Sequence, residues 1–263
     1  MIYVLLADGF EEIEAFAPID ILRRAGRKVQ TVGITGMTVC GAHGIAVQAD
    51  IAPAEATEPI DLLVLPGGMP GAANLDASPE VDRLLQAAMA QGAHIGAICA
   101  APFILGKRNL LVGRAATCYP GFEEHLHGAH KLQQRVVTSD TFTTAVGMGA
   151  AFEFGLSLLV ALGEEEKAKK IANDAFLPDP MPAQAPVITK ELQIAVMRAG
   201  YRNGRLTSGI LQRELSIYDS EAVHLLGSLD AMGFICSNIK ERCYDMVMDE
   251  DAFEAWAATE DKE

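Results

Sequence analysis

Residues 94–105 read HIGAICAAPFIL, and this stretch passes from an apolar strand pattern directly into a helix pattern at Cys99. The same alternation recurs along the first part of the chain. Short apolar runs predict strands at 2–7, 29–34, 61–65, 135–138 and 142–144, and periodic patterns predict helices at 15–26, 81–91 and 150–162. Buried strands that alternate with helices predict an α/β fold with a mostly parallel sheet covered on both faces. Ligands of such folds bind at the carboxyl ends of the strands, where Cys99 is expected to lie.

Composition narrows the class of protein. The chain has 263 residues, of which 50% are hydrophobic, and a formal net charge of −14. So large a negative charge argues against broad binding to nucleic acid or anionic membranes. The five cysteines are odd in number and none lies in a CxxC pair, so we expect reduced thiols, no metal site and no cofactor. Because the chain starts with a strand pattern and has no apolar stretch of about 18 residues, a cytoplasmic protein without membrane contact is predicted.

A change of composition at Leu177 predicts a domain boundary. Residues 1–177 form the α/β domain, and 178–187 form a stiff linker, because four prolines fall between residues 177 and 186. Residues 188–250 show three helix patterns and then two short strand-like pieces, the order of a small winged helix-turn-helix domain. Residues 251–263 are an acidic tail, in which Phe253 and Trp256 have the spacing to dock together.

The position of Cys99 favours a reactive thiol. A strand that runs straight into a helix makes a tight turn, and the side chain at that turn projects from the sheet edge, as nucleophiles do in α/β enzymes. The small neighbours Gly96, Ala100 and Ala101 leave room around it. The positive end of the helix dipole is expected to lower the thiol pKa and favour the thiolate, which is the better nucleophile and the better target for peroxide. The alternative is that Cys99 is a small buried hydrophobic residue.

Three glutamates after the first strand are candidates to hold a proton beside the sulfur. Glu11 and Glu12 are explained as acidic residues that cap the first helix. Glu14 lies in the apolar stretch IEAFAPI, so it is expected to be buried. A buried carboxyl tends to stay protonated and can donate a hydrogen bond to a thiolate. The glycine turn at 66–68 (PGG) offers backbone N–H groups for an oxyanion hole, or is an ordinary turn.

These segments together resemble the ThiJ/PfpI superfamily, in the branch of the parkinsonism-associated deglycase. The resemblance rests on DGFEEIEAFAPIDILRRAG (8–26), VLPGG (64–68), AICAAP (97–102) and SDTFTTAVGMGAAFEFGLSLL (139–159). It spans residues 1–177 and implies a flavodoxin-like, doubly wound sheet, a homodimer and a small-molecule substrate.

The resemblance also implies roles for individual residues. It identifies Cys99 with the family's cysteine and Glu14 with its protonated glutamate. The oxyanion amides fall on Gly68 and Ala100, and Gly67 shapes the turn. An arginine of the RRAG segment, Arg23 or Arg24, is expected to help bind anions across the dimer.

The chain departs from the family pattern at one position. Many members carry His-Pro after the strand that follows the cysteine, whereas this chain has Tyr119 before Pro120. A histidine would be the general acid or base, and a tyrosine, which titrates about three pH units higher, would instead donate a hydrogen bond. His43, in the GAHGI turn, is a further pocket candidate. The histidines at 125, 127 and 130 could substitute, or lie in a solvated loop.

The C-terminal segment TSGILQRELSIYDSEAVHLLGSLDAMGFI (207–235) resembles the winged-helix gamma domain of FtsK-type DNA translocases. The resemblance implies the fold and a DNA-reading helix. From Val187 onward the chain carries 8 Lys and Arg against 14 Asp and Glu, a net charge of −6, and such a surface would repel phosphates. We therefore expect this domain to contact protein, with DNA as the alternative.

Three functions follow from these residues. The first is a cysteine-centred enzyme of the deglycase or glyoxalase type, in which Cys99 attacks small reactive carbonyls or their adducts. The second is a peroxide-responsive redox sensor or chaperone that works through oxidation of Cys99. The third is a regulator in which the first domain senses a signal and the winged helix contacts DNA.

Overall fold

The structure, a computed structural model, describes residues 1–177, 190–215, 219–238, 241 and 243–258. Contacts divide the chain into two compact units, Met1–Met181 and Pro182–Glu263. The linker predicted at 178–187 lies outside the described residues. Among the helices that are described, none combines the length and the apolar character needed to cross a membrane.

The first unit is built on a six-stranded sheet with the order β2-β1-β5-β6-β10-β9. Neighbouring strands are parallel except for β9, which pairs antiparallel with β10 at one edge. When the five parallel strands alone are numbered along the chain, their order is 2-1-3-4-5, which is the flavodoxin-like order. The strands are β1 (Ile2–Leu6), β2 (Val29–Gly33), β5 (Leu62–Leu65), β6 (His94–Ile98), β9 (Val136–Ser139) and β10 (Phe142–Ala145).

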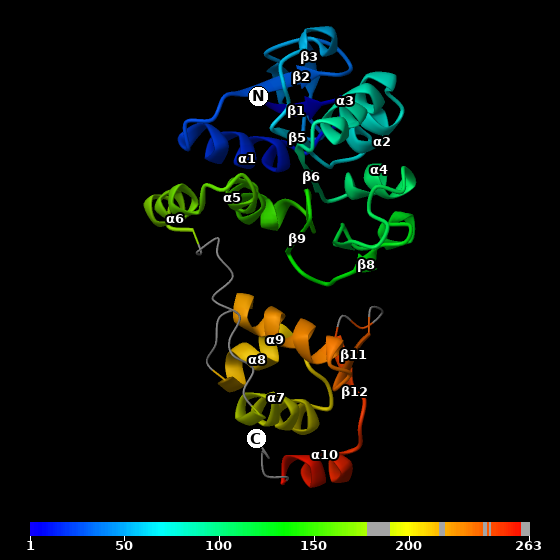
Figure 1. Cartoon of the computed structure of the whole chain (residues 1–263), viewed down its shortest axis with the longest axis vertical. Helices are drawn as coiled ribbons and strands as arrows, with labels where there is room; N and C mark the ends of the chain where they lie inside the picture. Colours follow the sequence, from blue (N-terminus) through cyan, green and yellow to red (C-terminus); the bar gives the residue numbers. More distant parts are fainter. Residues whose placement is uncertain (178–189, 216–218, 239–240, 242, 259–263) are drawn as a thin grey trace. The chain divides into compact units, whose positions relative to one another are not determined.

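Helices cover both faces of this sheet (Figure 1). Alternate residues of β1 point to opposite faces, so Tyr3 and Leu5 join one core cluster while Ile2 and Val4 join the other. The first cluster packs against α2 (Gly71–Asp76), α3 (Pro79–Ala90) and α4 (Pro102–Lys107). The second packs against α1 (Glu12–Arg24), α5 (Ala151–Ala161) and α6 (Glu165–Asp174). The prediction of a mostly parallel α/β sheet is confirmed.

A glycine lets α5 lie close to the sheet beneath the predicted site. A Cβ on Gly96 would come within 2.8 Å of Leu158 and 2.9 Å of the Phe154 ring. Gly96 therefore serves helix packing, rather than the open space around Cys99 that the sequence suggested.

Several small elements have no counterpart in the sequence prediction. A hairpin of β3 (Thr38–Cys40) and β4 (Ala46–Gln48) follows β2, and its turn reaches the start of α1. The others are β7 (Ala115–Ala116), β8 (His130–Lys131) and the 3₁₀ turns η1 (Pro53–Glu55), η2 (Glu123–His125) and η3 (Met148–Ala150).

The second unit has its own core. Its helices are α7 (Lys190–Asn203), α8 (Ser208–Leu215), α9 (Asp219–Ala231) and α10 (Glu250–Ala257), and its hairpin is β11 (Ile235–Asn238) with β12 (Cys243–Met246). Helix α10 includes residues 251–257 of the expected acidic tail. Phe253 anchors this helix, because it is fully buried and its ring lies 5.1 Å from that of Tyr201.

Candidate active site

Three strand ends meet at the predicted site. Glu14 follows β1 on the first turns of α1, Gly67 and Gly68 follow β5, and Cys99 follows β6. The strand order reverses between β1 and β5, and the crevice at such a reversal is where open α/β sheets bind their ligands.

Cys99 occupies an unusual backbone conformation. Its φ is 64°, in the left-handed region that residues other than glycine seldom adopt. The conformation is held from both sides, because the Cys99 N–H donates to the Ala145 carbonyl (2.8 Å) and the Cys99 carbonyl accepts from the Tyr119 N–H (2.8 Å). Such a conformation costs about 1–3 kcal/mol and is concentrated at functional sites. The turn thus orients a partly buried sulfur at the sheet edge.

Glu14 is buried beside this sulfur, with an exposed fraction of 1%. Its Oε2 accepts the Gly67 N–H at 3.0 Å, its carboxyl also accepts from the Met148 N–H, and it shares a hydrogen bond with Cys99. A Cβ on Gly67 would lie 2.5 Å from Glu14 Oε2 and 2.7 Å from Cys99 Cβ, so a side chain there would separate the pair. Gly67 is therefore required for the contact.

Two backbone amides complete the surroundings of the sulfur. The N–H groups of Gly68 and Ala100 hydrogen-bond to it from the β5 and β6 turns. Gly68 has a φ of 84°, which a glycine adopts without strain. The structure thus brings together the five positions that the sequence grouped: Cys99, Glu14, Gly67, Gly68 and Ala100.

Electrostatics couple the thiol and the carboxyl. Burial, with a smaller contribution from the charge of Glu11, raises the pKa of Glu14 to about 7. Burial, the charge of Glu14 and the hydrogen bond to it raise the pKa of Cys99 to about 12, against the two amides, which lower it. The repulsion between the two groups vanishes when Glu14 holds the proton, so the position of one shared proton decides whether the sulfur is a thiolate.

This electrostatic picture corrects the expectation that the helix dipole lowers the thiol pKa. Helix α4 has only six residues and begins at Pro102, so Cys99 lies before the helix rather than in its first turn. Depth of burial and the neighbouring acid dominate instead.

Tyr119 and Gly147 bound the space next to the sulfur. A Cβ on Gly147 would lie 3.9 Å from Cys99 Sγ, 3.9 Å from Glu14 Oε1 and 3.4 Å from the Tyr119 ring, so all three groups surround one point. Tyr119 is half-exposed. Gly147 and Met148 were not singled out from the sequence, although the GMG turn directly after a predicted strand marks the same sheet edge.

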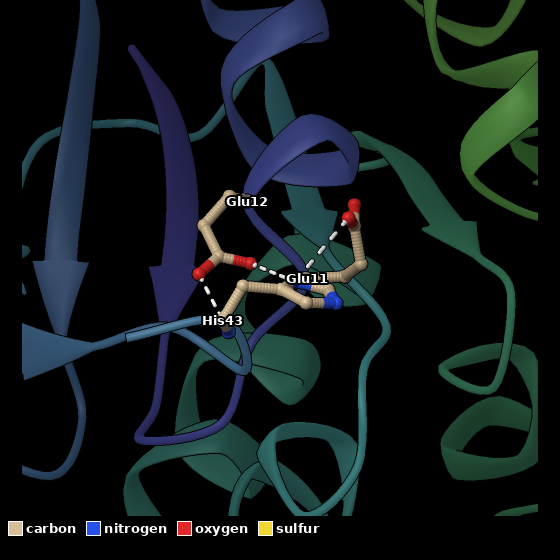
Figure 2. Close-up of side chains that lie close together, drawn as sticks. All are labelled: Glu11, Glu12 and His43. Carbon is tan, nitrogen blue, oxygen red and sulfur yellow. Dashed lines mark hydrogen bonds and ion pairs between the residues drawn. The ribbon is translucent and has the colours of Figure 1, made fainter. Parts of the chain in front are cut away.

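A second group of side chains surrounds the start of α1. Glu12 is buried, which the sequence did not predict, and its Oε2 lies 2.7 Å from His43 Nδ1 while its Oε1 accepts the His43 N–H at 2.8 Å. Figure 2 shows His43 turned toward Glu12, with Glu11 on its other side. Within the described ranges, these three residues have ligand atoms close enough to hold a metal ion. Hydrogen bonds already account for both carboxylate oxygens of Glu12 and for the ring nitrogen facing it.

The remaining predicted residues make contacts with groups other than the Cys99 sulfur. Arg24 is at the far end of α1, ten residues or about 15 Å from Glu14 along the helix axis, and pairs with Asp20 at 2.6 Å. Arg23 pairs with Asp50 at 2.9 Å. The expected role of these arginines in binding anions concerns the site of a second chain in the dimer. His125 packs its ring against two phenylalanines, Phe103 and Phe122.

Comparison with known proteins shows the family of this chain. A sequence model of the DJ-1/PfpI family matches residues 1–161. Protein dj-1beta of Drosophila melanogaster is 35% identical over 173 residues, which are 64% of this chain and 92% of that protein. Glutathione-independent glyoxalase DJR-1.2 of Caenorhabditis elegans is 32% identical over 170 residues, which are 64% of this chain and 91% of that protein. The structure of oxidized DJ-1 from Toxoplasma gondii superposes with a TM-score of 0.63 at 36% identity, covering 67% of this chain and 97% of that one.

Proposed function

This chain belongs to the DJ-1/PfpI family, and we propose that its first unit is an enzyme that acts on small reactive carbonyl compounds or their adducts. Cys99 is the nucleophile and Glu14 is its proton partner. One observation carries the proposal: a strained turn holds the Cys99 sulfur against a buried carboxyl and two backbone N–H donors. The glyoxalase name of the Caenorhabditis elegans relative supports the substrate class.

In the reactive state the shared proton is on Glu14 and the sulfur is a thiolate. The thiolate then accepts three hydrogen bonds, from Glu14 and from the N–H groups of Gly68 and Ala100. Burial favours the neutral form of Glu14. The higher pKa of Cys99 keeps the shared proton on the sulfur at rest, so the reactive state is the one in which Glu14 has taken that proton. In that state the negative charge resides on the sulfur, which is the atom that attacks a carbonyl carbon.

For methylglyoxal the proposed steps balance without a cofactor. The thiolate forms a bond to the aldehyde carbon, and the resulting oxyanion takes the proton from Glu14. The Glu14 carboxylate then removes the hydrogen from that carbon as a proton and returns it to the neighbouring carbon. The hydroxyl proton on the first carbon passes to the ketone oxygen of the second, so the first carbon is oxidised to a thioester and the second is reduced to an alcohol. Water cleaves the resulting thioester, which releases lactate and the thiol. Tyr119 borders the same space as the Cys99 sulfur, and there it donates a hydrogen bond to a substrate oxygen.

Conversion of methylglyoxal to lactate tests this function. We expect turnover by the full chain and its loss, by at least about a hundredfold, in Cys99→Ala and Glu14→Gln. Cys40→Ala is the matched control, because Cys40 is an exposed thiol of the same unit and should leave the rate unchanged. Turnover that persists in Cys99→Ala would rule out the nucleophile.

The same donors support a second function, a peroxide-responsive sensor or chaperone. A thiolate that is partly accessible reacts with peroxide, and the neutral acid and the amides around Cys99 can hydrogen-bond the oxygens of a sulfinate. Mass spectrometry after graded peroxide should then find Cys99 oxidised before the other four thiols. Earlier oxidation of exposed Cys40 or Cys236 would argue against a sensor.

We also propose that the chain is a homodimer formed through the first unit. Ile13 on α1 and Phe152 on α5 are large apolar residues that are 43% and 46% exposed, and these two helices pack on each other. A second copy would cover them. Light scattering should give twice the chain mass, and Ile13→Glu should shift it toward the monomer.

For the second unit we propose a winged helix that contacts protein. The order of three helices and a hairpin supports the fold, and the net charge of −6 from Val187 onward disfavours phosphate contacts. The alternative, a regulator that binds DNA, predicts a mobility shift of duplex DNA at moderate salt. Absence of a shift at micromolar protein would leave protein contact as the function.

A further inference from the structure

We propose that Glu11 is a positioning residue that shifts the shared proton from Cys99 toward Glu14, and that His43 sets how strongly Glu11 acts. This inference rests on the proposed function, because it concerns the same thiolate. It assigns a task to residues that the sequence explains only as helix caps and a surface turn.

Glu11 joins the two segments that hold the reactive pair. Its Oε2 accepts the Glu14 N–H at 2.7 Å, so it caps the helix that carries the carboxyl. Its own N–H donates to the Gly67 carbonyl at 3.0 Å, beside the turn that directs an amide to the sulfur. A Cβ on Gly68 would collide with the Glu11 backbone nitrogen, so this approach depends on the glycine. Glu11 is therefore fixed, and its side chain is only 15% exposed.

The carboxylate of Glu11 distinguishes between the two positions of the proton. With the proton on Cys99, the pair holds its negative charge on Glu14, next to the negative Glu11. With the proton on Glu14, the charge moves to the sulfur. The charge of Glu11 raises the pKa of Glu14, whereas burial and Glu14 itself are the leading causes that raise the pKa of Cys99. Like charges repel, so Glu11 favours the second arrangement, which is the reactive one.

His43 opposes this effect from the solvent side. Its Nδ1 lies 2.7 Å from Glu12 and 4.0 Å from Glu11 Oε1, and its side chain is 71% exposed (Figure 2). The hydrogen bond and the charge of Glu12 raise the pKa of His43, so the ring stays positive to a higher pH than a free histidine. Glu12, which is negative, and His43, which balances part of Glu11 when it is protonated, both have polar atoms within 4.8 Å of the Glu11 carboxylate.

Two variants test the assignment with opposite signs. Glu11→Gln removes the charge but keeps an oxygen that can accept the Glu14 N–H, and it should lower the iodoacetamide alkylation rate of Cys99 near pH 6.5 on the order of fivefold. His43→Asn keeps a donor for Glu12 but removes the positive charge, and it should raise that rate. The ultraviolet absorbance of the thiolate gives a second measurement, after subtraction of the spectrum of the same protein carrying Cys99→Ser. This absorbance should be lower in Glu11→Gln and higher in His43→Asn than in the unmodified chain.

The controls separate this inference from the proposed function. Asp20→Asn removes one negative charge from the outer end of α1 and should leave the alkylation profile unchanged. If Cys99 of the unmodified chain reacts no faster than exposed Cys40, the proposed function fails. The role of Glu11 is refuted if Cys99 is alkylated faster than Cys40 but Glu11→Gln changes the alkylation rate of Cys99 by less than about twofold. It is also refuted if Glu11→Gln and His43→Asn change that rate in the same direction. Because His43→Asn leaves the helix cap intact, it remains informative if Glu11→Gln folds poorly.

Discussion

Replacing Glu14 with glutamine removes a buried carboxyl and keeps its size. Burial raises the pKa of this carboxyl from 4.5 to about 7. A group whose folded pKa lies above its unfolded value contributes stability that is fully present below the unfolded pKa and is lost as the pH rises through the folded pKa. The folded chain should therefore lose stability between about pH 4.5 and pH 7, and Glu14→Gln should lack this loss.

The size of the effect follows from the shift. At about 1.4 kcal/mol per pKa unit, a rise from 4.5 to about 7 corresponds to about 3 kcal/mol. Most of this difference falls between about pH 5 and pH 8. We therefore compare the free energy of unfolding of the unmodified chain with that of Glu14→Gln. The first minus the second should fall by about 2–3 kcal/mol over that pH range. This holds whichever atom of the pair carries the proton.

Urea unfolding read by brief proteolysis measures this difference for the first unit, because cleavage products report each unit separately. The pair of variants Cys99→Ser and Cys99→Ser with Glu14→Gln repeats the comparison without the thiol, so that the carboxyl titrates alone. A difference that stays constant within about 0.5 kcal/mol between pH 5 and pH 8 would refute the raised pKa of Glu14. It would also remove the physical basis of the neutral acid in the proposed mechanism.

Three further predictions concern other parts of the chain. His94 is buried and its pKa is lowered to about 4 by burial, so stability should be lost as the pH falls from 6.5 toward 4, and His94→Gln should flatten this loss of about 3 kcal/mol in acid unfolding curves. Gly147 has a φ of 155°, so Gly147→Ala strains the backbone as well as placing a methyl group beside Cys99; it should slow the reaction of Cys99 with N-ethylmaleimide about tenfold more than with iodoacetamide. Phe253→Ala should destabilise the second unit by about 3–5 kcal/mol in urea, whereas a frayed tail would show no change.

The fold was predictable where burial is continuous along the chain. The apolar runs at 2–7, 61–65 and 94–99 each correspond to a central strand, within one residue at the carboxyl end and at most one at the amino end. Elements at the surface of the first unit have a weaker hydrophobic pattern in the sequence. The β3–β4 hairpin has one fully buried residue, Val39, and helix α6 is largely charged, so neither stands out by hydrophobic pattern alone.

The members of the site were predictable, and their energetics were not. Strand ends of a parallel sheet share one edge, which is why Cys99, Glu14 and Gly67 could be grouped before any contact was known. The direction of the thiol pKa depends on depth of burial and on the charge of the nearest acid, and neither can be read from chain order. Gly147 escaped notice for a related reason: it contributes space rather than a functional group.

The contrast between Glu12 and Glu14 shows how two carboxyls about half a helical turn apart have two chemical roles. Both carboxyls are buried, and burial by itself raises the pKa of each. Around Glu12 the hydrogen bonds from the ring and backbone of His43 outweigh burial, so its pKa is lowered and it remains a carboxylate. Around Glu14 there is a thiol and a second acid in place of a cation, so its pKa stays raised and it can carry a proton. Environments that drive the pKa values of neighbouring carboxyls apart identify which is structural and which is the acid. By this criterion Glu12 anchors the hairpin turn, and Glu14 is the group that can exchange a proton with Cys99.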